Sequence, residues 1–247
     1  MSSESTVVTA AMLAIGDELL SGRTKDKNIA YLAEFLTAIG IDLCEVRIVP
    51  DSHTEIIAAV NALRARYDYV FTSGGIGPTH DDITADAIAA AFGISIGVDE
   101  RALGPMLQYY EKRGIELTPA RKRMARIPAG AILIDNPVSM APGFQVENVL
   151  VMAGVPSIFQ AMLDSAAPTL RTGTKLHSVA VECNFPEGTI GDGLAAIAGR
   201  HRPVAIGSYP RFDGKTYSTQ IVVRGRKAED VDLACQEIRQ MLSEFKT

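Results

Sequence analysis

The stretch TSGGIGPTHDDITADA, residues 72–87, decides the fold and points to a site. A short apolar segment, YVFT at 69–72, runs into three glycines and a proline, and Asp81 and Asp82 follow before the sequence becomes helical near Ile83. A strand, a glycine-rich turn and a helix in this order are typical of a parallel α/β sheet. The two adjacent carboxylates repel each other, so their place beside such a turn needs a reason of its own.

The residues upstream repeat the alternation of strand and helix. Segment 7–15 is almost continuously apolar, as a strand covered on both faces is, and IDLCEVRIV at 41–49 is a second strand. SHTE at 52–55 has the form of a capping box. Two helices follow these strands with apolar residues at the 3.6 period, the first ending at Gly40: Ile29, Leu32, Ala33, Leu36 and Ile39, then Ile56, Ala59, Val60 and Leu63.

This alternation predicts an α/β fold, a three-layer, mostly parallel sheet with helices on both faces. Ligands of such sheets bind beyond the carboxyl ends of the strands. We therefore expect the loops 16–27, 50–51 and 73–82, all of which carry acidic residues, to meet on one rim.

The remaining sequence is less regular and ends in a second domain. We predict helices near 99–112 and 118–126, strands at 131–134 and 149–153, and turn-rich loops at 136–144 and 153–159. Polar RTGT at 171–174 indicates a boundary between domains 1–170 and 171–247. Half-buried antiparallel strands and helices near 188–199 and 229–245 then make a small α+β domain, βαββα, with Val179, Val181, Cys183, Thr219, Ile221 and Val223 facing inward.

Composition limits the partners and the compartment. The net charge is −5 and the one basic patch, RKRMAR at 121–126, reads as a solvated helix face, so we expect no nucleic-acid partner. The cysteines Cys44, Cys183 and Cys235 are scattered, which predicts reduced core thiols in a cytoplasmic protein. The N-terminal apolar run is too short for a membrane span and lacks the basic flank of a signal peptide.

An ordered set of motifs carries a family resemblance. AIGDELLSGRTKDKN, VPD, TSGGIGPTHDDITADAIA, APGF and AGVP follow one another between about residues 8 and 170. This set resembles the molybdopterin-binding (MoaB/Mog-like) fold, and specifically the N-terminal part of the competence/damage-inducible protein A (CinA) family. One stretch departs from it: that family commonly has Asn-Pro-x-Gly-Thr before APGF, whereas residues 136–140 read NPVSM.

The resemblance implies chemistry at a phosphoanhydride. Relatives bind and adenylylate molybdopterin, or are linked to metal-dependent hydrolysis of nucleotide pyrophosphates such as ADP-ribose or FAD. It implies a divalent metal (Mg²⁺, Mn²⁺ or Co²⁺), K⁺ as a further ion, a small nucleotide or pterin phosphate as ligand, and a homo-oligomer. We do not expect deamidation of nicotinamide mononucleotide, because the deamidase domain that many such proteins carry is not in this sequence.

The residues themselves agree with a site for phosphate and metal. Glycines that take positive φ let backbone N–H groups approach an oxyanion, and a hard cation would explain the carboxylates. We expect Asp82 and Asp51 to be catalytic and Asp82, Asp51 and Asp17 to offer metal ligands. The expected ligand-binding residues are Ser73, Gly74, Gly75, Gly77, Pro78, Gly16, Asp17, Glu18, Asn28, Pro142 and Gly143.

Plainer interpretations of the same residues stay open. Asp81 and Asp82 could cap a helix, which stabilises it by about 0.5–2 kcal/mol. Asp51 could be a turn residue, Asp17 and Glu18 a solvated loop, and the glycines structural only. His80 could be a general base or a surface residue, and Arg23, Lys25 and Lys27 could neutralise phosphate or lie free in solvent. The preferred function is metal-dependent hydrolysis of nucleotide pyrophosphates. Its alternatives are molybdopterin binding and adenylylation in molybdenum cofactor biosynthesis, and a ligand-binding module without catalysis.

Overall fold

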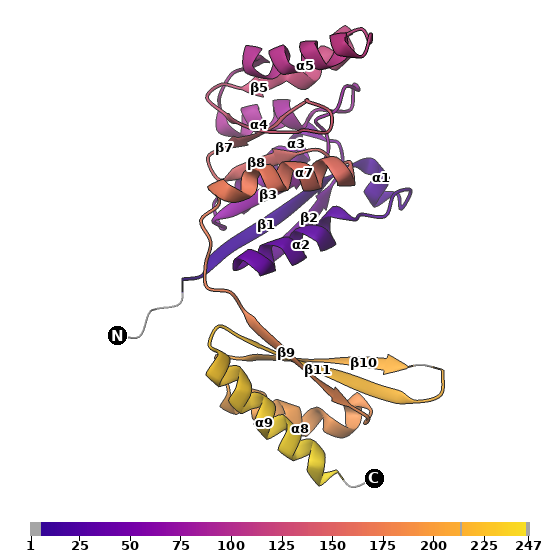
Figure 1. Cartoon of the computed structure of the whole chain (residues 1–247), viewed down its shortest axis with the longest axis vertical. Coiled ribbons are helices and arrows are strands. Elements are labelled where there is room, and N and C mark those ends of the chain that lie inside the picture. Colours follow the sequence, from indigo (N-terminus) through magenta and orange to yellow (C-terminus); the bar gives the residue numbers. More distant parts are fainter. Residues whose placement is uncertain (1–5, 213, 246–247) are drawn as a thin grey trace. The chain divides into compact units, whose positions relative to one another are not determined.

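The computed structural model describes residues 6–212 and 214–245. The chain divides into two compact units, Val7–Gly173 and a second made of Thr6 together with the residues from Thr174 onward. Each unit has its own hydrophobic core. Figure 1 shows the elements of both.

The first unit is built on a six-stranded sheet with strand order β2-β1-β3-β8-β7-β6. The β1–β2, β1–β3 and β3–β8 pairs are parallel, while β7 runs antiparallel to both of its neighbours. The strands are β1 (Val8–Ile15), β2 (Ile41–Val49), β3 (Tyr69–Ser73), β6 (Ile132–Ile134), β7 (Gly143–Val146) and β8 (Val149–Met152).

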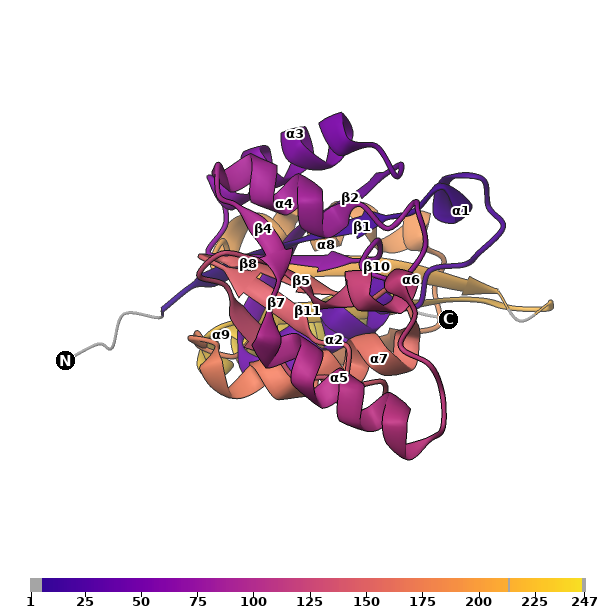
Figure 2. The same ribbon diagram turned by 90° about the horizontal axis from the view of Figure 1, so that it is seen from above.

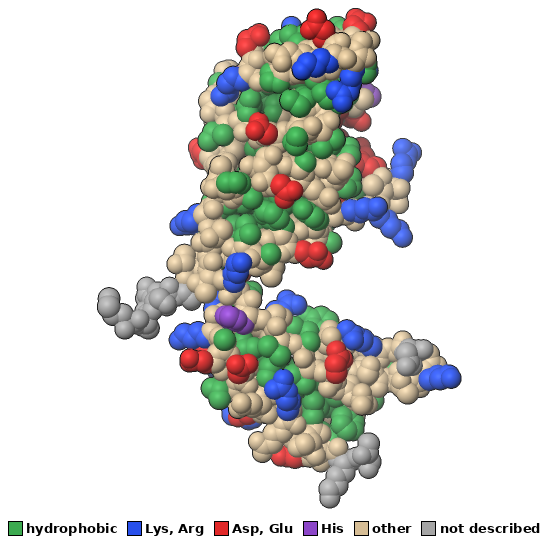
Figure 3. Space-filling model, in the orientation of Figure 1, with side chains coloured by type: hydrophobic (Ala, Val, Ile, Leu, Met, Phe, Trp, Pro, Cys, Tyr) green, Lys and Arg blue, Asp and Glu red, His purple; other side chains and the backbone are tan. Residues whose placement is uncertain are grey.

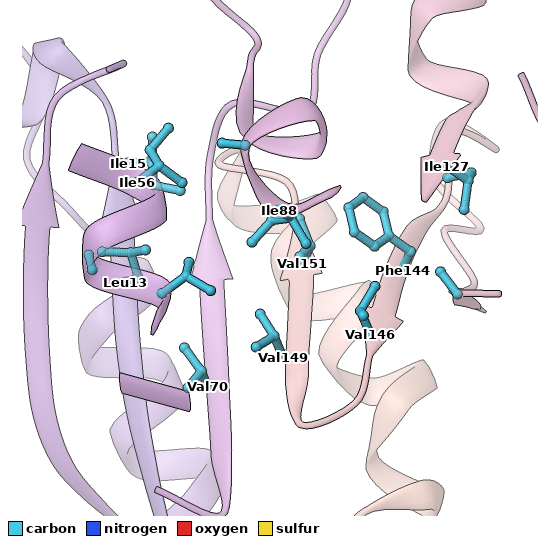
Figure 4. Packing of buried hydrophobic residues seen from close by; sticks show 14 of the residues in the cluster. Leu13, Ile15, Ile56, Val70, Ile88, Ile127, Phe144, Val146, Val149 and Val151 are labelled. Atoms are coloured by element: carbon cyan, nitrogen blue, oxygen red, sulfur yellow. The ribbon is translucent and has the colours of Figure 1, made fainter. Parts of the chain in front are cut away.

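Helices cover both faces of this sheet because its central strands are apolar on both sides. Leu13, Val70 and Val149 pack towards α3 (His53–Arg64) and α4 (Thr84–Phe92), as Figure 4 shows for this cluster. Their neighbours along the strands, such as Met12 and Leu150, pack towards α2 (Asn28–Ile39) and α7 (Pro156–Ala166). Figures 1 and 2 show the two helix pairs on opposite faces, which confirms the three-layer prediction.

The region from 93 to 170 differs most from the prediction. The expected loop 136–144 runs into β7, which begins at Gly143, and the expected loop 153–159 contains the start of α7. Pro156 stands in the first turn of α7, where its missing N–H has no intrahelical partner to lose. The other elements here are β4 (Ile96–Val98), α5 (Glu100–Lys112), α6 (Pro119–Lys122), a 3₁₀ turn η1 (Arg123–Ala125), β5 (Arg126–Pro128) and a 3₁₀ turn η2 (Ala167–Thr169).

Two predicted helix caps are absent from the structure. Ser52 stands at the N-cap of α3 but its side chain caps nothing, so the predicted capping box is not formed. Helix α4 begins at Thr84 after the N-cap Ile83, without a side-chain cap. The interpretation of Asp81 and Asp82 as helix caps is therefore wrong.

The second unit has the predicted βαββα order. Its antiparallel sheet, order β10-β11-β9, packs against two helices. Its core includes Val181, Cys183, Ile221 and Val223, as the alternation predicted. The elements are β9 (His177–Cys183), α8 (Glu187–Arg200), β10 (Ala205–Phe212), β11 (Tyr217–Gly225) and α9 (Ala228–Glu244).

The burial of the cysteines and the distribution of surface charge test two predictions from composition. Cys183 and Cys235 are buried thiols, but Cys44 is exposed because it lies on β2, an edge strand, so the prediction of a core thiol is wrong there. On the face shown in Figure 3, basic and acidic side chains are interspersed without a continuous basic field. Among the described residues, no helix combines the length and the apolar character that crossing a membrane requires.

Candidate functional site

A cavity of about 620 Å³ opens where the first unit's parallel strands end. Its walls come from the segments that follow β1, β2, β3 and β8, together with α5, η1 and the 136–141 loop. The acidic loops after β1, β2 and β3 therefore share one cavity, as the right-handed crossovers predicted. The predicted residues that line it are Gly16, Glu18, Asp51, Gly74, Gly75, Gly77, Pro78 and Asp82.

One wall of the cavity is acidic. Glu18, Asp51, Asp81 and Asp82 line it, and no Lys or Arg is among its described lining residues. Burial raises the pKa of Asp51 above the ordinary aspartate value; an accepted hydrogen bond from the Asp17 N–H (3.0 Å) opposes this, and the charges of Asp17, Glu18 and Asp81 add to it. Four carboxylates without a cation make a site that attracts positive charge.

The turn after β3 presents unpaired backbone donors. Gly74 and Gly75 take φ of +111° and +70°, in the region that favours glycine. The Gly74 N–H donates to the Met152 carbonyl (3.1 Å). Within the described part of the chain, the next three N–H groups, those of Gly75, Ile76 and Gly77, have no hydrogen-bond acceptor, and all three residues line the cavity. Consecutive free N–H groups of this kind bind anions.

Gly77 serves this turn in another way than predicted. Its φ is not positive, so the expectation of positive φ is wrong for this glycine. A Cβ at Gly77 would lie 2.6 Å from Asp82 Oδ2, so the missing side chain makes room for the carboxylate. That same oxygen accepts hydrogen bonds from the Thr79 N–H (2.7 Å) and hydroxyl (2.6 Å). Asp82 is thus held by its own turn, and its other oxygen, Oδ1, has no hydrogen bond in the described structure.

The neighbouring Asp81 also faces the cavity. The polar side chain of Thr79 beside Asp81 is the main cause that lowers the pKa of Asp81 below its usual range. His80, by contrast, is exposed and is not among the residues that line the cavity. The turn therefore offers two carboxylates to the cavity rather than a histidine.

Asn28 and Ser73 lie behind the cavity instead of in its wall. Both are almost fully buried, and the Asn28 amide donates to Ser73 Oγ and to the Gly154 carbonyl, each at 2.8 Å. This pair ties the ends of β3 and β8 together, which holds the glycine turn in place. Asp17 does not line the cavity, and it acts on the site through its N–H and its charge beside Asp51.

The predicted pair Pro142 and Gly143 also lies outside the main cavity. Gly143 is buried in β7, where a Cβ would lie 2.4 Å from the Val151 carbonyl oxygen, so close strand packing explains this glycine. The preceding loop does reach the cavity through Asn136 and Ser139, whose side chains share a hydrogen bond of 2.6 Å. The departure from the family pattern at 136–140 had marked this loop in the sequence.

Sequence reasoning missed the apolar part of the lining. Single residues far apart in the sequence make it, and their spacing carries no signal: Ile76, Tyr110, Met124, Ile158 and Met162. Arg23, Lys25 and Lys27 are exposed and do not line the cavity, although Thr24 between them does.

The donor set fits a hard divalent cation only in part. Within residues 6–212 and 214–245, no group of three or more His, Cys, Asp or Glu is placed to hold a metal ion. A hydrated Mg²⁺ that also binds substrate phosphate needs one or two carboxylates. Asp82 and Asp51, both in the cavity wall, supply such oxygens, and Asp82 Oδ1 is free to do so.

Two family models together match almost the whole chain. Residues 11–172 match the model described as "Probable molybdopterin binding domain". Residues 175–247 match "FAD synthase, middle domain". The first model covers the unit that contains the cavity.

Individual relatives agree with these matches. A protein of Caldivirga maquilingensis is 32% identical over 96% of this chain and 97% of its own length. A CinA-like protein of Desulfosudis oleivorans is 32% identical over 95% of this chain, but the match spans 60% of that longer protein. The crystal structure of "the protein CinA with unknown function" from Thermoplasma acidophilum is 35% identical, with a TM-score of 0.61 over 66% of this chain and 98% of that one. The chain therefore belongs to the molybdopterin-binding (MoaB/Mog-like) domain family, as one of its CinA-like members.

Proposed function

We propose that this protein is a divalent-metal-dependent hydrolase of nucleotide pyrophosphates such as ADP-ribose or FAD. One observation carries the proposal: a single cavity joins three free backbone N–H groups, at Gly75–Gly77, to four carboxylates. Free N–H groups suit phosphate, but carboxylates repel it unless a cation lies between them. A phosphate ligand that arrives with a divalent ion satisfies both.

The rest of the cavity suits a flat ring. Its volume lies within the range of small-molecule sites, roughly 300–1,000 Å³. Tyr110, Met124 and Ile158 are among the apolar side chains that line it. Aromatic and thioether groups pack well on a planar base. The cavity therefore offers an apolar surface to the base of a nucleotide and the glycine turn to its phosphates.

The reaction divides among named residues. Asp82 and Asp51 would hold the divalent ion, which when bound polarises the phosphoryl group and lowers the pKa of a water ligand. The N–H groups of Gly75, Ile76 and Gly77 would donate to the phosphate oxygens.

The second unit supports the flavin nucleotide within this substrate class. Its match to the middle domain of FAD synthase links the chain to proteins named for that nucleotide. FAD and ADP-ribose both contain an AMP half joined through a pyrophosphate, so one cavity serves either.

The test is a screen of substrates against metals. ADP-ribose, FAD and NAD are each incubated with the protein and Mg²⁺, Mn²⁺ or Co²⁺, with and without K⁺, and AMP release is measured. We expect metal-dependent release of AMP, abolished by chelator. Absence of AMP release from every substrate with every metal would reject the hydrolase.

A second candidate is the binding of molybdopterin without hydrolysis. The lack of a preformed three-ligand metal cluster in the described residues and the name of the matching family favour it. In that case, the protein binds molybdopterin more tightly than ADP-ribose, and saturating metal produces no AMP.

A further inference from the structure

This inference rests on the proposed function. With a pyrophosphate and one divalent ion bound, the cavity would hold more negative than positive charge. Four carboxylates line the cavity and no described Lys or Arg does. A pyrophosphate bridge adds about two negative charges at neutral pH, which one divalent ion cannot offset together with the carboxylates. A phosphate site of this kind usually contains an arginine or lysine.

Two cationic side chains of the basic patch at 121–126 lie beside the main cavity. A smaller hollow of about 20 Å³, room for about one water molecule, adjoins the main cavity and shares Gly75, Ile76, Gly77 and Asp82 with it. Arg123 and Arg126 line this hollow. Part of the patch therefore lies beside the glycine turn rather than on a solvated helix face.

Only one of these two arginines is free to act. Arg126 makes a bidentate ion pair with Asp86 (2.7 and 2.6 Å), which occupies its guanidinium. In the described part of the chain, Arg123 makes one hydrogen bond, a long one of 3.4 Å from Nη2 to the Asp82 carbonyl oxygen, and no ion pair. This contact places an uncompensated guanidinium next to the free N–H groups of the turn.

We propose that Arg123 binds the phosphoryl group of the substrate that lies over the Gly75–Gly77 turn, and thereby selects pyrophosphate ligands. Its planar fork donates two parallel hydrogen bonds to a phosphate. Because Arg123 is exposed and weakly bonded, it reaches the phosphate without breaking an ion pair.

Four proteins test the proposal: wild type, Arg123→Ala, Arg123→Gln and the control Lys122→Ala. Lys122 is exposed, lines neither cavity and carries the same charge. Glutamine keeps an N–H donor for the Asp82 carbonyl but has no charge. The probes are ADP-ribose and inorganic pyrophosphate, each with Mg²⁺, and adenosine, all measured by titration calorimetry.

We expect both Arg123 variants to bind ADP-ribose and pyrophosphate about tenfold or more weakly, as befits a lost charged hydrogen bond. Adenosine binding and Tm should not change, and Lys122→Ala should stay within about twofold for every probe. Equal losses in Lys122→Ala and Arg123→Ala would overturn the proposal, because they would reflect net charge alone. Full binding by Arg123→Gln would also overturn it, since the arginine would then only hold the loop.

The same experiment separates this inference from the proposed hydrolysis. Tight binding of ADP-ribose that depends on Arg123, without AMP release, supports the arginine and rejects the hydrolase. AMP release that Arg123→Ala leaves unchanged supports the hydrolase and rejects the arginine. A wild type that binds neither phosphorylated probe rejects both.

Discussion

The ionised form of Asp51 carries an energetic penalty in the folded protein. Its pKa is raised because burial and the nearby carboxylates of Asp17, Glu18 and Asp81 disfavour its charged form. A carboxyl group with a raised pKa in the folded state contributes stability below its unfolded pKa, and this contribution is lost as the pH rises through the folded pKa. At neutral pH the ionised Asp51 therefore destabilises the ligand-free fold.

Asp51→Asn should consequently raise Tm at pH 7–8 by about 1–2 °C without metal. The carboxamide oxygen still accepts the hydrogen bond of the Asp17 N–H. The gain should shrink as the pH falls towards the pKa of Asp51, where the wild type is protonated. Added Mg²⁺ should raise the Tm of the wild type more than that of the variant.

The control for this measurement is Asp192→Asn, which removes an equal charge from an exposed position on α8. Thermal melts across pH with and without metal distinguish the two positions. A variant of Asp51 that is less stable than the wild type at pH 8 would contradict the carboxylate crowding described above.

Asp82→Asn separates charge from local structure. The Thr79 N–H and hydroxyl bond to one carboxylate oxygen, and the asparagine oxygen accepts both, so Tm should change little. Turnover should fall by at least about a hundredfold, the scale of losing several kcal/mol of metal-borne stabilisation. Asp82→Ala should lose about 1 kcal/mol of stability as well. AMP release and thermal melts on both variants check this; full activity in Asp82→Asn would remove Asp82 from the metal ligands.

Among the elements, the β3–α4 turn depends on glycine at two positions for steric reasons. A Cβ at Gly75, whose φ is +70°, would lie 2.0 Å from Thr84 Oγ1, and one at Gly74 would lie 2.2 Å from the Ile15 carbonyl oxygen. The turn is therefore packed between the end of β1 and the start of α4. Strain there should disturb the free N–H groups as well as the fold.

Gly22 is a matched control for this turn, since its φ of +72° is nearly that of Gly75 and a Cβ there meets nothing within 4 Å. Gly22→Ala should lose about 1–2 kcal/mol, the strain of a left-handed alanine. Gly75→Ala should lose more and should weaken ADP-ribose binding, while Gly22→Ala should not. Denaturant unfolding and calorimetry measure both effects, and equal losses at the two glycines would contradict a packed turn.

The helices and strands were predictable where the apolar periodicity agreed with the residues that begin and end an element. The parallel strands and the helices α2 and α3 have strong apolar patterns, α2 ends at a glycine, and all were predicted near their observed bounds. For α4 the start near Ile83 was predicted. Helix α7 differs from the prediction although Phe159, Met162, Leu163 and Ala166 have helical spacing, because Gly154 and Pro156 favour a loop in the sequence. The short strand β7 has too few residues to show alternation.

The sequence predicted which loops form the site, but not the contacts that individual side chains make there. Topology alone placed the acidic loops on one cavity. Nothing in the sequence could show that Asn28 clamps two strand ends, that Gly77 makes room for Asp82, or that Arg126 is paired and Arg123 is not. These roles depend on side-chain geometry between residues distant in the chain.

At the scale of the whole molecule, the cavity belongs to one unit alone. Its lining residues fall between Ile15 and Met162, inside the unit Val7–Gly173. The two units have separate cores, and the two family models meet between residues 172 and 175. The Thermoplasma acidophilum structure matches over 98% of its own chain but 66% of this one, so that chain holds little beyond the equivalent of the first unit.

A chain ending at Gly173 should therefore fold and keep the site. We expect its Tm to match one transition of the full chain, and its kcat/KM for the preferred substrate to stay within about twofold, or about 0.4 kcal/mol of transition-state stabilisation. Circular dichroism melts establish that the fragment folds, and metal-dependent AMP release on the two proteins at equal concentration compares their activity. A fragment that melts cooperatively yet neither binds ADP-ribose nor releases AMP would mean that residues after Gly173 complete the site. We do not expect this result, because every described residue that lines the cavity lies before Gly173.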